Sequence, residues 1–282
     1  MHTLEYVDPK NYACLKVTIS FSSSLCKITP LRFFLELSYN GTSFHGWQRQ
    51  PNALSVQELI EEALTKLLKV NTAIMGAGRT DTGVHAAQMY AHFDVAEMAI
   101  DTDTLLFRMN RFLPNSIAIH AIHPVSDKAH ARFDATSRSY EYHIVQRKNP
   151  FHADSAYCFM APIALDAMNT AAALLLNHTN FKCFSRSRTD VKTYDCDVTI
   201  AQWESSNDTL IFHITANRFL RNMVRAVVGT LLDVGTGKIS LNDFQKILDS
   251  NDRTKAGSSA PAQGLFLTEV RYPNTIFERN EN

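Results

Sequence analysis

The sequence predicts an α+β fold made of two similar halves, with mostly antiparallel mixed sheets flanked by helices and a cleft between the halves. Two observations carry this prediction. Apolar and polar residues alternate in several short runs, as they do in strands that bury one face and expose the other. Runs with helical apolar spacing follow groups of these strands rather than each strand in turn, which favours an α+β arrangement over a parallel α/β one.

The composition is that of an ordinary globular protein. The chain has 282 residues, of which 45% are hydrophobic, and its 28 basic residues balance its 28 acidic ones. This length suffices to bury a substantial core, and the composition excludes collagen-like repeats and disorder of the whole chain. No segment approaches the roughly 20 consecutive apolar residues that cross a bilayer, so we expect no membrane contact.

The cysteines and the first residues indicate the compartment. The five cysteines are odd in number and scattered, and no two form a C-x-x-C pair, which argues against a disulfide framework and a thiolate zinc site. The start of the chain lacks the features of a secretory signal or a transit peptide. We therefore expect a cytoplasmic protein.

Residues 31–147 form the first predicted half. They follow an extension, residues 1–30, which shows no periodic pattern and which we expect to be disordered. Ser55 and Glu58 form a capping box that opens an amphipathic helix. The other expected elements are strands at 31–38, 86–95, 116–122 and 137–146 and a helix at 103–112.

Residues 148–282 form the second predicted half, with helices and strands in a similar style. Gly235 and Gly237 are expected to end its longest helix. The expected elements are helices at 165–176, 218–233 and 241–248 and strands at 196–204, 209–216 and 265–272.

A glycine-rich loop at 76–85 gathers polar groups between two predicted elements. Its sequence GAGRTDTGVH contains three glycines, Arg79 and Asp81. Glycine permits backbone conformations that other residues avoid, so the loop can form a tight turn that presents Arg79 and Asp81 at a surface. An ordinary turn with a self hydrogen bond at Asp81 explains the spacing equally well. The loop lacks the Lys-Ser/Thr pair of a phosphate-binding P-loop.

Three arginines occur where the predicted helix at 218–233 begins. Arg218, Arg221 and Arg225 would project from one stripe of that helix. A solvated face is the usual explanation of such a stripe. Apolar residues cover so much of this helix, however, that we expect part of the stripe to be half-buried. A buried arginine requires a carboxylate or a phosphate as its partner.

Two further segments are locally basic although the whole chain is neutral. Segment 128–148 has five basic and two acidic residues, and segment 182–192 has four basic and one acidic. Together with the three arginines, they leave a nucleic-acid partner and a plain solvated surface equally supported. The histidines show no metal-binding spacing, so we expect no metal site and interpret them as structural or RNA-facing.

Five ordered motifs resemble those of the tRNA pseudouridine synthase A family. They are GWQRQ followed by SVQE, GAGRTDTGVHA, HARFDATSRSYEY, ANRFLRNMVRAVVGTLLDVG and APAQGLFL, and the resemblance extends from about residue 31 to residue 272. It implies a homodimeric enzyme that needs no cofactor. The implied reaction converts uridine to pseudouridine at tRNA positions 38–40, on the 3′ side of the anticodon stem-loop.

The resemblance also implies roles for single residues. Asp81 would be the catalytic aspartate, paired with Arg225, and Tyr140 would stack on the target uracil. Arg79 would help to hold the displaced RNA, and Leu265 would line the base pocket. The other residues implied to contact RNA are His130, Arg132, Phe133, Arg188 and Lys192.

The chemistry of this isomerisation suits these residue types. Cleaving the N-glycosidic bond and rejoining the uracil through C5 needs one ionised carboxylate, and an adjacent arginine keeps a carboxylate charged. The target base must leave the helical stack at a cost of a few kcal/mol, which an aromatic platform and an inserted arginine offset. The sequence leaves open whether Asp81 attacks the sugar, attacks the base or removes a sugar proton. Thr82 departs from the alanine most common in the family, but keeps the turn.

Two other functions fit parts of the pattern. A catalytically silent tRNA-binding protein would use the same basic segments, but it has no need for Asp81, Tyr140 and Arg225 together. A nucleotide hydrolase built on the glycine-rich loop would need a phosphate-binding lysine and a cluster of metal-binding carboxylates, and the sequence shows neither.

Overall fold

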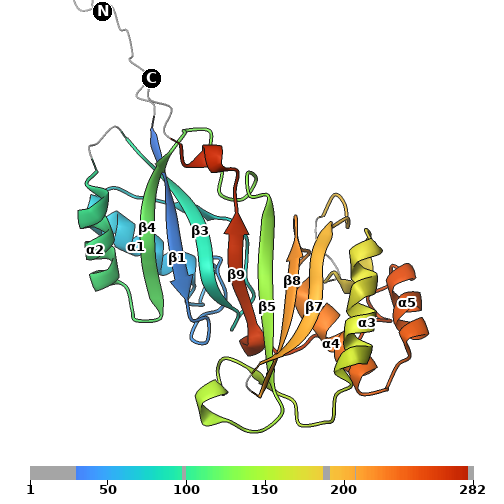
Figure 1. Cartoon of the computed structure of the whole chain (residues 1–282). Coiled ribbons are helices and arrows are strands. Elements are labelled where there is room, and N and C mark those ends of the chain that lie inside the picture. The colour runs from blue at the N-terminus through green and yellow to red at the C-terminus, as the bar shows by residue number, and fades with distance from the viewer. Residues whose placement is uncertain (1–29, 97–99, 187–190, 207, 279–282) are drawn as a thin grey trace, which may run out of the picture.

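The computed structural model describes residues 30–96, 100–186, 191–206 and 208–278, and within them nine strands form one mixed, mostly antiparallel sheet (Figure 1). The strands are β1 (Leu31–Tyr39), β2 (Ile74–Gly76), β3 (His85–Val95), β4 (Ile117–Val125), β5 (Ser137–Val145), β6 (Tyr157–Cys158), β7 (Val198–Ser206), β8 (Thr209–Ala216) and β9 (Leu265–Arg271). The helices are α1 (Val56–Leu68), α2 (Thr102–Phe112), α3 (Leu165–Ala173), α4 (Met223–Gly235) and α5 (Leu241–Asp249). The predicted α+β class is confirmed. Every helix among these residues is too short or too polar to span a bilayer.

A single sheet replaces the two sheets that the sequence predicts. The strand order is β4-β1-β3-β9-β5-β8-β7, with β2 paired to β3 and β6 to β5. The last strand of the chain, β9, is the link: it pairs in parallel with β3 and antiparallel with β5 (Figure 1). Alternation within a strand predicts its faces but not its neighbours, so the sequence could not show that β9 returns to the middle.

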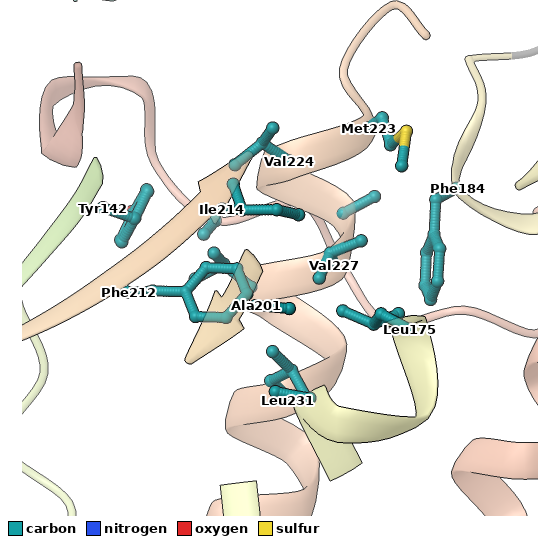
Figure 2. Packing of buried hydrophobic residues seen from close by; sticks show 14 of the residues in the cluster. Tyr142, Leu175, Phe184, Ala201, Phe212, Ile214, Met223, Val224, Val227 and Leu231 are labelled. Carbon is teal, nitrogen blue, oxygen red and sulfur yellow. The ribbon is translucent and has the colours of Figure 1, made fainter. Parts of the chain in front are cut away.

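Two hydrophobic cores lie along this sheet. One packs α1 and α2 against β1, β3 and β4, and the other packs α3, α4 and α5 against β5, β7 and β8. In the second core, Val227 and Leu231 of α4 lie against Phe212 of β8 (Figure 2). The central strands contribute to both: Tyr140 of β5 packs against each core. The domain boundary near residue 147 stays a prediction.

Helix α4 begins five residues later than the sequence predicts. Asn222, just before its first residue, has a left-handed backbone conformation with φ of 65°. That conformation interrupts the helical path, and apolar periodicity gives no sign of it. Arg218 and Arg221 therefore lie in the connection from β8 to α4, and the predicted stripe of three arginines on one helix is wrong.

Other local predictions need smaller corrections. Helix α3 ends at Ala173, and a 3-10 turn replaces the last part of the predicted helix at 165–176. Only half of the predicted capping box forms at α1. The Glu58 backbone N–H donates to Ser55 Oγ at 3.3 Å, whereas the Glu58 carboxylate lies 3.5 Å from Arg49.

Helix α4 lies unusually close to the chain segment that precedes β9. A Cβ atom on Gly229 would lie 1.8 Å from the carbonyl oxygen of Ser258, so only glycine fits there. The contact is held by hydrogen bonds from Gly257 N to Thr230 Oγ1 (2.9 Å) and from Ala260 N to the carbonyl of Arg225 (2.9 Å).

We expect Gly229→Ala to destabilise the protein by about 1–3 kcal/mol, because the added methyl group forces α4 and the segment apart. Helix propensity alone predicts the opposite sign, since alanine is the better helix former. Urea unfolding measures the difference. Gly78→Ala is the control, because its Cβ would meet nothing within 4 Å. A Gly229→Ala protein as stable as the wild type would contradict the close approach.

Candidate active site

Asp81 lies in the loop between β2 and β3, residues 77–84, which we call the Asp81 loop. Backbone hydrogen bonds fix this loop to the chain that follows β1. Trp47 N donates to the carbonyl of Thr80 at 3.2 Å, and Gly83 N donates to the carbonyl of Phe44 at 3.3 Å. The position of the loop therefore depends on a segment that lies far from it in the sequence.

Gly46 makes this attachment possible. Its φ of 90° lies in the left-handed region, and a Cβ atom there would lie 2.4 Å from the carbonyl oxygen of Thr80. On the other side of Thr80, its Oγ1 lies 2.9 Å from the buried hydroxyl of Tyr39. The close approach of the Asp81 loop therefore requires a glycine at this position of the GWQRQ motif.

His85 holds the end of the Asp81 loop. Its Nδ1 accepts a hydrogen bond from Gly41 N (3.1 Å), and its Nε2 donates to the carbonyl of Gln263 just before β9 (3.2 Å). This bonding requires the neutral Nε2–H tautomer. Burial lowers the pKa of His85, which favours the neutral ring. The structural interpretation of this histidine is confirmed.

Arg225 and Arg221 both reach Asp81 from the other half of the sequence. Arg225 Nη1 lies 3.4 Å from Asp81 Oδ2, and Arg221 Nε lies 3.8 Å from Asp81 Oδ1. Arg225 is also held from behind, because its Nε donates to the carbonyl of Ala260 at 2.7 Å. Its side chain is 21% exposed, whereas that of Arg221 is 58% exposed. Arg225 is accordingly the closer and more buried partner of the carboxylate.

Tyr140 lies on β5, within electrostatic range of the Asp81 carboxylate. Its ring packs edge-on against Phe219, with the ring centroids 5.1 Å apart. Burial raises the pKa of Tyr140 to about 12, so its phenol stays neutral at physiological pH. Leu265 is buried at the start of β9, directly opposite Tyr142.

The predicted RNA-binding residues His130, Arg132 and Phe133 lie in a compact turn, residues 130–135, which we call the basic loop. His130 Nδ1 accepts hydrogen bonds from the backbone N–H groups of Arg132 (3.1 Å) and Phe133 (3.3 Å). His92 Nδ1 accepts one from Ala131 N (3.1 Å). The phenylalanine ring remains 74% exposed, with the Arg132 guanidinium 5.7 Å from its centroid. The turn therefore presents an aromatic and a cationic group together.

Comparison with known proteins identifies the family. Residues 37–134 and 171–273 match the family model described as tRNA pseudouridine synthase. This chain belongs to that family.

The tRNA pseudouridine synthase A of Bacteroides fragilis is 48% identical to this chain over 88% of the chain and 98% of that protein. The protein of the same name from Porphyromonas gingivalis is 49% identical, covering 87% and 99%. That from Chlorobaculum tepidum is 37% identical, covering 84% and 96%. A solved partial Cas6-RT-Cas1–Cas2 complex aligns with a TM-score of 0.22, which is too low to indicate a shared fold.

The other residues predicted to bind RNA make fewer contacts with the rest of this pseudouridine synthase family member. Arg79 is exposed and forms no ion pair with any described residue, and Lys192 is also exposed. Arg188 lies outside the described residues. No cluster of three or more His, Cys, Asp or Glu side chains that could hold a metal ion occurs in the described part of the chain.

Sequence reasoning missed several residues that shape the site. Ala260 acts through its backbone carbonyl, which no sequence pattern marks. Arg221 was expected on the helix, yet it approaches Asp81 from the connection before it. Phe219 packs against Tyr140 from the same connection. Arg138 was counted only as part of a basic segment, although it bonds to several of the loops above.

We expect acid to destabilise the fold through His92. This side chain is only 8% exposed, and burial, together with the nearby charge of Arg32, lowers its pKa to about 4. An unfolded histidine titrates near 6.5, so between these values the unfolded chain binds more protons. The stability from the neutral ring is therefore complete above about pH 6.5 and decreases by up to about 3 kcal/mol as the pH falls toward 4.

Urea unfolding of the wild type and of His92→Asn across this pH range measures the effect. Asparagine keeps an acceptor for the Ala131 N–H but does not titrate, so the stability difference between the two proteins should vary with pH. A difference that stays constant from pH 7 to pH 4 would show that His92 is not responsible.

Proposed function

We propose that this protein converts uridine to pseudouridine in the anticodon stem-loop of tRNA, with Asp81 as the catalytic carboxylate. The observation that carries the proposal is the position of Asp81, on a loop fixed from both ends and paired with Arg225, beside Tyr140. Family membership and the high identity to tRNA pseudouridine synthases A support the same reaction.

The reaction needs little from the protein beyond one charged group and precise placement. The bond between N1 of uracil and C1′ of ribose breaks, the detached base turns, and a bond forms between C5 and C1′. N1 then carries a proton and C5 loses one, so no electron donor or acceptor is consumed. Attack on the sugar, attack on the base and removal of a sugar proton all require a carboxylate held in a fixed place, and the ion pair with Arg225 provides this.

Aromatic and apolar groups around Asp81 suit a base turned out of its stack. Tyr140 offers a neutral ring for stacking, and Leu265 offers an apolar wall at the start of β9. Arg79 is exposed on the Asp81 loop without a protein partner among the described residues. It is thus free to occupy the space that the displaced nucleotide leaves in the RNA.

The basic loop is the proposed contact for the RNA backbone. His130, Arg132 and Phe133 form a preorganised turn, and Lys192 is exposed in a second basic segment, to which Arg188 also belongs. One neutral chain offers only separate basic patches, so we propose that two copies form a homodimer that binds tRNA between them. We propose that the catalytic cleft lies at the junction where Asp81 meets Arg225. We also propose that the enzyme acts in the cytoplasm.

The decisive test compares the wild type with Asp81→Asn. Each purified protein is incubated, without added cofactor or metal, with unmodified tRNA transcript, and pseudouridine is mapped by carbodiimide adducts and primer extension. We expect wild-type stops confined to the 3′ side of the anticodon stem-loop. Asp81→Asn should lower the rate at least about 100-fold, because asparagine keeps the shape without the charge.

Affinity for tRNA should change little in the Asp81→Asn protein, and the exposed Asp166→Asn variant should match the wild type in both measurements. A fully active Asp81→Asn protein would refute the assignment of Asp81. Salt-sensitive tRNA binding by a wild type that forms no pseudouridine would instead identify a silent tRNA-binding protein.

A further inference from the structure

Arg138 occupies the junction of the loops that carry the proposed site. It lies on β5, two residues before Tyr140. Its guanidinium donates four hydrogen bonds, all of them to backbone carbonyls. Nη1 donates to Ala135 (3.0 Å) and Asn217 (2.9 Å), and Nη2 donates to Ala77 (3.1 Å) and Arg132 (2.6 Å).

The four carbonyls come from three separate loops, each of which carries a side chain of the proposed site or one that approaches it. Ala77 begins the Asp81 loop. Arg132 and Ala135 belong to the basic loop. Asn217 begins the connection that leads from β8 to Arg221 and then to α4. One guanidinium therefore bonds to the loop that carries Asp81, to the basic loop and to the connection that carries Arg221.

This bonding pattern differs from that of an ordinary buried arginine. Such a side chain usually pairs with a carboxylate, which ties it to one segment. Arg138 forms no ion pair with any described carboxylate, and its bonds go to uncharged carbonyls instead. Because the guanidinium is planar and rigid, it fixes the directions of its acceptors as well as their distances. Lysine cannot reproduce this, since its ammonium is a compact group on a flexible stem.

We infer that Arg138 is a positioning residue for the isomerisation, which holds the Asp81 loop, the basic loop and the connection to α4 in one relative arrangement. RNA bound by the basic loop then presents its target uridine at Asp81. This inference rests on the proposed function. Arg138 does not touch the reacting atoms, so its loss should slow the bound complex more than it weakens binding.

The experiment compares the wild type with Arg138→Lys and Arg138→Met. Arg271→Met is the matched control, because Arg271 lies on the neighbouring strand opposite Ser137, and its side chain is 66% exposed in an ion pair with Glu269. For each protein we would measure the midpoint of thermal unfolding and the dissociation constant for unmodified tRNA. The single-turnover rate of pseudouridine formation is then measured with saturating enzyme, well below the unfolding midpoint.

We expect Arg138→Lys to lower the single-turnover rate at least tenfold and to change the dissociation constant less than threefold, because lysine keeps the charge but not the planar fork. Arg138→Met should lower the rate at least as much and should also weaken tRNA binding, since the basic loop and its neighbours lose all four hydrogen bonds. Arg271→Met should match the wild type in rate and affinity. A purely structural role would not separate the rate from the affinity in this way.

Three outcomes would overturn the inference. One is a wild-type rate in Arg138→Lys, and another is a loss of rate and affinity in equal proportion. The third is failure of both Arg138 variants to fold, which would make the residue part of the core rather than a positioning group. Failure of the proposed function is distinguishable from all of these, because the wild type itself would then form no pseudouridine.

Discussion

The ion pair between Asp81 and Arg225 is the contact on which the arrangement of the site depends. It joins residues 144 positions apart in the sequence, across the boundary between the two cores. Each partner is held by backbone groups: the Asp81 loop by the chain around Gly46, and Arg225 by the carbonyl of Ala260. The carboxylate is thus presented in a fixed place rather than on a free loop.

The continuous sheet makes this meeting possible. Strand β9 pairs with β3, which follows the Asp81 loop, and with β5, which carries Tyr140. The segment just before β9 bonds both to His85 and to Arg225. A strand from the end of the chain therefore brings together the loop of the first core and the helix of the second. Gly229 permits this by letting α4 approach the same segment closely.

The sequence predicted local structure well where apolar periodicity decides it. The predicted bounds of β8 agree with the structure, and those of the other predicted strands and helices differ by up to five residues, whereas the short strands β2 and β6 were not predicted. The start of α4 was missed because a single left-handed residue, Asn222, overrides a continuous apolar pattern. The joining of two sheets into one was missed because strand pairing depends on contacts distant in sequence, which alternation does not encode.

In the candidate site, too, the sequence predicted some features and missed those that depend on contacts distant in sequence. Asp81, Tyr140 and Arg225 were selected from motifs, and the structure brings Arg225 within 3.4 Å of Asp81 and Tyr140 within electrostatic range of it. The groups that hold them act through backbone carbonyls and N–H groups, such as that of Ala260 and those bonded by Arg138. Side-chain identity does not indicate such contacts, so the sequence alone could not predict them. The catalytic roles of Asp81, Tyr140 and Arg225 are proposals that rest on this geometry and on the family.

We propose that Arg225, rather than its neighbour Arg221, holds the Asp81 carboxylate in place for the reaction. The most direct measurement is the single-turnover rate of pseudouridine formation in Arg225→Met and in Arg221→Met, with saturating enzyme. Because Arg225 is closer and is held by Ala260, the account predicts at least about a tenfold larger loss of rate in Arg225→Met. Equal losses in the two variants, or a larger loss in Arg221→Met, would contradict it.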